Sequence, residues 1–197
     1  VGAAVVARLP GSPWYVQRNL LLLMARLETW PEGFTPLPYA KHADPRVRRE
    51  AYALLLRDPA TRGESIALAV ADSDERIVRA ALNAALEGGC PREAIPVLTE
   101  RIGAHSLDGM MAVLAIRVIA PVRLPAVLDV LIKSVLSAKR RWFFGRKLAP
   151  KSQPMLAALT ALAATWSLEP QAMKVLAIAA RDTDPAVQNA IRGRAHE

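Results

Sequence analysis

The sequence is poor in the residues that mark metal, disulfide or catalytic chemistry. It has one cysteine, Cys90, and three histidines in 197 residues, and aromatic residues make up 5% of the chain. A single cysteine excludes an internal disulfide, and the histidines show no paired ligand spacing, so we expect no metal site. The chain also contains no Gly-rich phosphate loop and no serine between the glycines of a nucleophile elbow. We therefore expect no cofactor, no catalytic residues and a non-enzymatic role.

Long apolar runs are missing too, and so are segments in which apolar and polar residues alternate. Uncharged apolar stretches reach only about ten to fifteen residues, which is too short to cross a bilayer, so we expect no transmembrane segment. The N-terminus lacks the order of regions found in a signal peptide, which favours a soluble, cytoplasmic protein. The missing alternation disfavours strands, whereas apolar residues at every third or fourth position predict helices throughout the chain.

The net charge is +8, and its distribution is uneven. Residues 1–100 contain 12 basic and 12 acidic side chains, whereas residues 117–151 contain nine basic side chains and one acid, Asp129. The whole excess of positive charge therefore lies in residues 117–151. Such a segment is a candidate for contact with an acidic partner or with nucleic acid.

A short string recurs along the chain at intervals of about thirty residues. Clear copies begin at Asp44, Asp74 and Asp184, a related copy begins at Ser12, and weaker copies begin near Ser106 and at Ser152. In the copies at Ser12, Asp44 and Asp184, the serine or aspartate is followed by proline and then by an apolar stripe, which is typical of the first turn of a helix. Shorter helices are predicted between the copies, at residues 35–42, 61–71, 92–102, 125–138 and 169–181.

These copies resemble the second helices of the short bacterial HEAT repeat. The residues that carry the resemblance are Asp44, Pro45, Val47, Arg49 and Ala51, with Asp74, Ile77, Arg79 and Ala81 in the next copy. The resemblance implies an all-α fold, a right-handed α-solenoid (α-α superhelix) of about six HEAT-like helix pairs. We expect one domain, 1–197, with repeats at about 1–30, 34–58, 60–88, 91–120, 124–167 and 169–197. Solenoids normally end in polar capping repeats, and the last predicted helix here ends at Glu197 without one. We therefore also expect this domain to be excised from a longer chain.

Arginines at equivalent positions of the repeats allow two interpretations. The structural repeat positions are Arg18, Asp44, Arg49, Asp74, Arg79 and Asp184. The arginines could form a basic ladder for phosphates, but in HEAT repeats this arginine usually pairs with a helix-start aspartate, which favours a structural role. The additional basic residues Arg46, Arg48 and Arg76 are expected to face solvent.

The candidate partner-binding site is a basic, aromatic segment that interrupts the fifth helix pair. Its residues are Lys139, Arg140, Arg141, Trp142, Phe143, Phe144, Arg146, Lys147 and Lys151. Long loops in repeat arrays tend to be functional or disordered, and interleaved basic and aromatic side chains can bind phosphates and bases, a membrane interface or an acidic protein groove. Alternatively, the three aromatic side chains cover the core while the basic residues are solvated.

These features together favour a binding protein. We expect a protein-binding scaffold or adaptor domain whose concave surface docks a protein partner or another domain of the same polypeptide. The alternative is a nucleic-acid-binding HEAT-like domain that acts through residues 117–151. The two differ in salt dependence, because phosphate contacts weaken steeply with salt.

Overall fold

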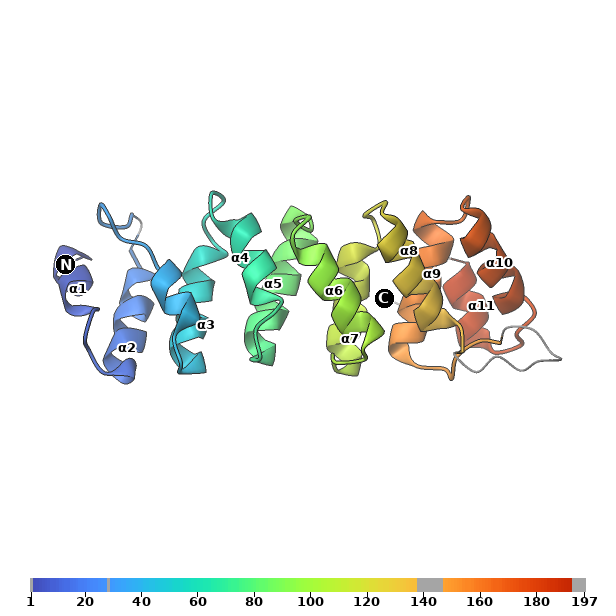
Figure 1. The fold of residues 1–197 in the computed structure, drawn as a ribbon, viewed down its shortest axis with the longest axis horizontal. Coiled ribbons are helices and arrows are strands. Elements are labelled where there is room, and N and C mark those ends of the chain that lie inside the picture. The colour runs from blue at the N-terminus through green and yellow to red at the C-terminus, as the bar shows by residue number, and fades with distance from the viewer. Residues whose placement is uncertain (1, 28, 138–146, 193–197) are drawn as a thin grey trace. The chain divides into compact units, whose positions relative to one another are not determined.

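The computed structural model describes residues 2–27, 29–137 and 147–192 (Figure 1). Within these ranges the chain forms α-helices and one 3-10 helix but no strand, so the prediction of an all-α fold is confirmed. The elements are α1 (Gly2–Arg8), α2 (Trp14–Met24), η1 (Leu37–Lys41), α3 (Pro45–Leu55), α4 (Arg62–Ala69), α5 (Glu75–Gly88), α6 (Ala94–Gly103), α7 (Gly109–Ile119), α8 (Pro125–Val135), α9 (Gln153–Thr165), α10 (Pro170–Ala179) and α11 (Pro185–Ile191). No helix in this described part is both long enough and apolar enough to span a membrane.

The recurring string begins helices by capping them. The side chains of Asp44 and Asp184 each accept the amide hydrogen of the residue two positions on, at 2.8 Å. Asp108 and Ser152 each accept the amide hydrogen three positions on, at 2.6 and 3.3 Å. These bonds satisfy first-turn amides that have no partner inside the helix. The helix starts predicted at Asp44, Asp184 and Ser152 therefore have a local physical cause, and the start predicted near Ser106 lies at Asp108.

The chain divides into two compact units, residues 1–84 and 85–197, and α5 passes from one to the other. In the first unit, α1 packs on α2, α2 on α3, and α3 on both η1 and α4. Apolar side chains at helical spacing fill the core between these elements. The most deeply buried include Leu21, Met24, Val47, Ala51, Leu54 and Leu55.

In the described part of the second unit, three successive helix pairs follow the end of α5: α6 with α7, α8 with α9 and α10 with α11. The first helices contact one another in chain order, α6 with α8 and α8 with α10. The second helices do the same, α7 with α9 and α9 with α11 (Figure 1). Buried side chains between the two layers include Leu98, Ile116, Leu131, Leu159 and Leu162.

The helices between the copies lie near their predicted positions, with two differences. Residues 35–42 form only the short 3-10 helix η1, in which Pro36 precedes the first turn and Pro38 lies within it. Each proline disfavours the α-helical conformation of the residue before it, which shortens the helix. The helix predicted at 125–138 ends at Val135, because the next residue, Leu136, forms an antiparallel bridge with Leu148. The other three predicted helices match α4, α6 and α10 to within two residues at each end.

Candidate functional site

Most of the predicted basic, aromatic segment lies outside the described residues. Lys139, Arg140, Arg141, Trp142, Phe143, Phe144 and Arg146 all fall within 138–146, and only Lys147 and Lys151 are described. On either side of the segment the backbones pair, because the amide of Ser137 donates to the carbonyl of Lys147 at 2.9 Å and the amide of Ala149 donates to that of Val135 at 2.8 Å. The described residues that flank 138–146 therefore lie side by side between α8 and α9.

Lys151 has a partner within the fold. Its Nζ atom donates to the carboxylate of Asp184, which also caps α11. The hydrogen bond from Lys151, together with the amide of Ala186, holds the pKa of Asp184 below its usual value. Lys151 thus links the start of α9 to the start of α11, and part of its charge is neutralised there.

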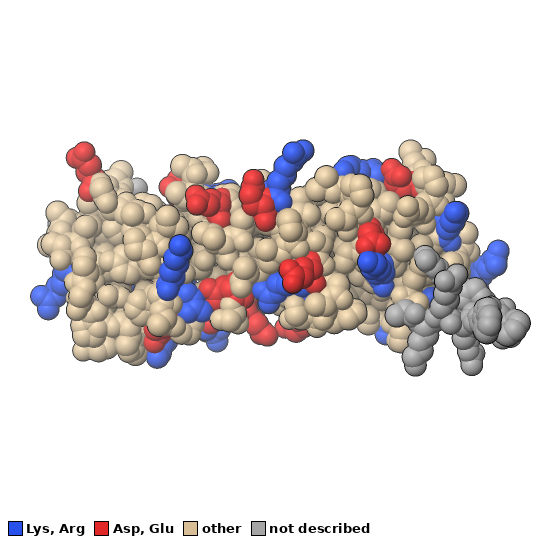
Figure 2. Space-filling model, in the orientation of Figure 1, with Lys and Arg blue, Asp and Glu red and all other residues tan. Residues whose placement is uncertain are grey.

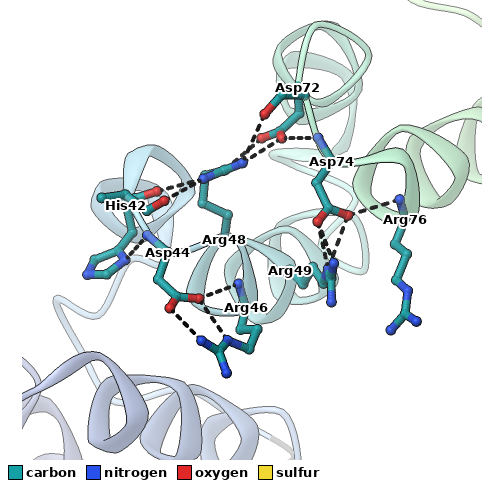
Figure 3. Close-up of polar contacts among 10 residues, drawn as sticks. His42, Asp44, Arg46, Arg48, Arg49, Asp72, Asp74 and Arg76 are labelled. Atoms are coloured by element: carbon teal, nitrogen blue, oxygen red, sulfur yellow. Dashed lines mark hydrogen bonds and ion pairs between the residues drawn. The ribbon is translucent and has the colours of Figure 1, made fainter.

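The repeat arginines have different surroundings, and Figure 3 shows those of Arg49. Arg49 donates to the carboxylate of Asp74 in the following repeat, with its Nε atom 3.1 Å from both oxygens. This bond is the main reason why the pKa of Asp74 lies below its usual value. Arg18 instead approaches Glu50 at 3.4 Å, and Arg79 is exposed.

Arg48 was predicted to face solvent, and this prediction is wrong. Its side chain is 14% exposed, and its Nε and Nη2 atoms each lie 2.8 Å from the carboxylate of Asp72, which is 8% exposed (Figure 3). Its Nη1 atom donates to the carbonyls of His42 and Ala43 at 3.0 and 3.1 Å. Burial alone raises the pKa of Asp72, but the bonds from Arg48 and from the Asp74 amide outweigh it, so the net pKa is lowered. Burial of an arginine requires this degree of hydrogen bonding.

A second feature that the sequence did not reveal lies two residues before three of the aspartates. His42 Nδ1, Asp72 Oδ1 and Asp182 Oδ1 each accept the amide hydrogen of the residue two positions on, at 2.8 to 2.9 Å. These bonds fix the turn that precedes each second helix. The sequence signal is a polar acceptor two positions before the helix-start aspartate, which becomes visible only when the three copies are aligned.

The other two arginines predicted to face solvent, Arg46 and Arg76, are exposed. Arg46 lies 3.8 Å above the centre of the Trp14 ring and pairs with Asp44 at 3.1 Å. On the face of the molecule drawn in Figure 2, acidic and basic side chains are interspersed. In the first unit, four arginines each form an ion pair, namely Arg18, Arg46, Arg48 and Arg49.

The second helices of the second unit present a different surface. We call it the α7–α9 face, and its residues are Met110, Val113, Leu114, Arg117, Leu156, Ala157, Thr160, Ala163 and Ala164. They recur at intervals of three and four and are the exposed or half-buried positions of two helices that pack together. Arg117 is the one charged residue among them.

A shallow groove of about 470 Å³ lies between the first helices α6 and α8. Apolar side chains such as Ile95 and Val130 line it. On its rim, Lys133 pairs with Asp129 at 2.7 Å, so these two charges offset each other. In the described part of the chain, no group of three or more His, Cys, Asp or Glu side chains is arranged to hold a metal ion.

Comparisons of the sequence and structure with family models, curated proteins and solved structures found no match. The resemblance to HEAT repeats therefore stays a prediction from the repeat residues.

Proposed function

We propose that this chain is a HEAT-like α-solenoid domain that serves as a non-enzymatic protein-binding scaffold. In this proposal the helix pairs continue as a right-handed superhelix, and its concave surface is formed by the second helices. A protein partner, or another domain of the same polypeptide, docks on that surface.

The observation that carries the proposal is the order in which the helices of the second unit contact one another. Each first helix contacts the next first helix, and each second helix contacts the next second helix. Stacking of this kind is the basis of solenoids, in which each repeat contacts only its neighbours and the stack offers one extended binding surface.

The polar contacts of the first unit support the same proposal. Arg48 and Arg49, on one second helix, bind Asp72 and Asp74 of the following repeat. The two ion pairs hold α3 and the start of α5 at a fixed spacing, so the solvent-facing surfaces of these helices are held in place. A surface that is held rigid before binding loses less conformational entropy when a partner docks.

Nucleic-acid binding through residues 117–151 is the second candidate, and the excess of basic residues there favours it. Two of the nine basic side chains, Lys133 and Lys151, already form ion pairs with Asp129 and Asp184. These pairs reduce the charge available to phosphates, which is why we place protein binding first.

Two measurements test the proposal. In the first, binding of duplex and single-stranded oligonucleotides is measured at two salt concentrations for wild type and for a variant with Lys139, Arg140, Arg141, Arg146 and Lys147 changed to Ser. We expect weak binding near physiological salt. Tight binding that falls steeply with salt and is lost in the variant would favour the nucleic-acid candidate instead.

The second measurement is affinity capture of partners by the full chain, followed by binding assays with the purified partner. We compare Arg79→Glu and Arg117→Glu, on second helices, with Leu68→Asp and Lys174→Glu, on first helices. All four side chains are exposed, so the fold should tolerate each change. The proposal predicts that at least one second-helix variant weakens binding and that both first-helix variants bind normally. The reverse pattern would contradict it.

A further inference from the structure

We infer that the α7–α9 face binds an amphipathic helix that carries a carboxylate within its apolar stripe. This inference rests on the proposed function and names the class of partner and the helices that receive it.

The spacing of the α7 side chains suits a helix as ligand. Met110 is 71% exposed, and Arg117 lies seven residues later on the same side of the helix. Seven residues make two turns, about 10 Å of helix. Val113 and Leu114 lie between them and are half-buried, so the solvent-facing side of α7 is one helical stripe against which a second helix can pack side by side.

The adjacent helix α9 extends this surface. Its inner side is buried, with Leu159 and Leu162 fully covered, and it packs on α7, α8 and α11. Its outer side carries Leu156, Ala157 and Thr160, which are half-buried and uncharged. A helix that is apolar on nearly all sides is normally covered on all sides. The outer side of α9 therefore suits an apolar partner.

Arg117 determines the chemistry of that partner. It is exposed and forms no ion pair with any residue that the structure describes, in contrast to Arg48, Arg49 and Lys151. Covering it with an apolar surface alone would leave a charge buried without a partner, which is strongly unfavourable. A carboxylate on the docked helix can instead bind the guanidinium through two hydrogen bonds. A single cation in an apolar surface fits this arrangement better than it fits a row of phosphates.

The test uses a displayed library of helix-forming peptides in which the positions of one helical stripe are randomised. The full chain serves as bait in three forms, wild type, Arg117→Glu and Lys174→Glu. Lys174 is an exposed cation on the first helix α10, so its reversal is the matched control. We expect peptides selected on wild type and on Lys174→Glu to carry Asp or Glu in the stripe. Peptides selected on Arg117→Glu should carry Lys or Arg at that position.

The affinity of the best synthetic peptide is then measured for wild type and for single variants, to locate the residues that contact it. Arg117→Glu should weaken binding at least tenfold, because an attraction becomes a repulsion, and Met110→Asp should do the same by placing a charge in the apolar stripe. The matched control Met173→Asp, on α10, should change the affinity less than twofold. Circular dichroism and urea midpoints should be unchanged for all three variants, because each side chain is exposed.

Three results would overturn the inference. The first is a failure to select any peptide above background, and the second is selection without preference for acids. The third is self-association of wild type that Arg117→Glu abolishes in sedimentation, because the face would then bind a second copy. If selected peptides bind other second helices and ignore Arg117, the inference fails while the proposed function stands. If they respond only to Met173 or Lys174 on α10, both fail.

Discussion

Removal of the Arg48 side chain tests whether the buried charge pair holds two repeats together. The Arg48→Met variant replaces the arginine with an unbranched side chain of similar length, which keeps the packing but lacks the guanidinium. Asp72, 8% exposed, then loses both hydrogen bonds from Arg48 and becomes a nearly buried carboxylate. The carbonyls of His42 and Ala43 also lose a donor. Removing one member of a buried ion pair costs roughly 3 to 5 kcal/mol, and because Arg48 retains some contact with water we expect about 3 kcal/mol.

The assay is urea denaturation at neutral pH, followed by circular dichroism, which gives the free energy of unfolding. Arg46→Met is the matched control, because Arg46 lies two residues away on the same helix and its side chain is 55% exposed. Exposed pairs contribute little, so the control should lower the midpoint much less. A double variant, Arg48→Met with Asp72→Asn, should recover part of the loss, since the nearly buried group is then a neutral amide instead of a carboxylate. Equal midpoints for Arg48→Met and Arg46→Met would refute the reasoning.

Three further predictions concern acid, a buried indole and the single thiol. The pKa values of Asp72 and Asp74 are lowered in the folded chain, so the two ionised carboxylates stabilise the fold fully above the unfolded pKa of about 3.9, and this stabilisation is lost as the pH falls below about 4. Urea midpoints measured between pH 7 and 2 should show the loss, and the loss should be smaller in Asp74→Asn. Trp166 is 3% exposed and donates from Nε1 to the carbonyl of Ala120 at 2.9 Å, so Trp166→Phe should lower the free energy of unfolding by about 2 kcal/mol, and an unchanged thermal midpoint would contradict this. Burial raises the pKa of Cys90 to about 11, so about one thiol in a thousand is ionised at pH 8, and labelling by a thiol reagent should be at least tens of times faster in urea.

The helix starts could be predicted from the sequence because their causes are local. Asp44 and Asp184 cap amides two residues away, and the proline that follows each cap suits the first helical turn. A reader of the sequence sees both partners within one short string. The end of α8 at Val135 could not be predicted, because it depends on a non-local contact, the bridge between Leu136 and Leu148 across an insertion.

The long-range pairs could not be predicted in this way. Arg48 and Asp72 are 24 residues apart, and Lys151 and Asp184 are 33 apart. Whether such side chains meet depends on the length of the intervening loop and on how one repeat packs on the next. Arg48 also follows a buried valine, and from helical periodicity alone it is placed at the edge of the buried stripe, where solvent exposure is the default.

Exposed and partly buried side chains differ in whether they also link helices of the fold, and this difference decides which variants can map a binding surface. In the first unit, Arg48 and Arg49 hold the following repeat through Asp72 and Asp74. If a variant of either arginine no longer binds a protein partner, the cause is ambiguous, because the substitution can also shift the helices. Arg117 and Met110 make no such link, since both are exposed on the outer side of α7. Loss of binding in Arg117→Glu at an unchanged urea midpoint can therefore be assigned to contact, and the α7–α9 face is the place where binding and stability can be separated.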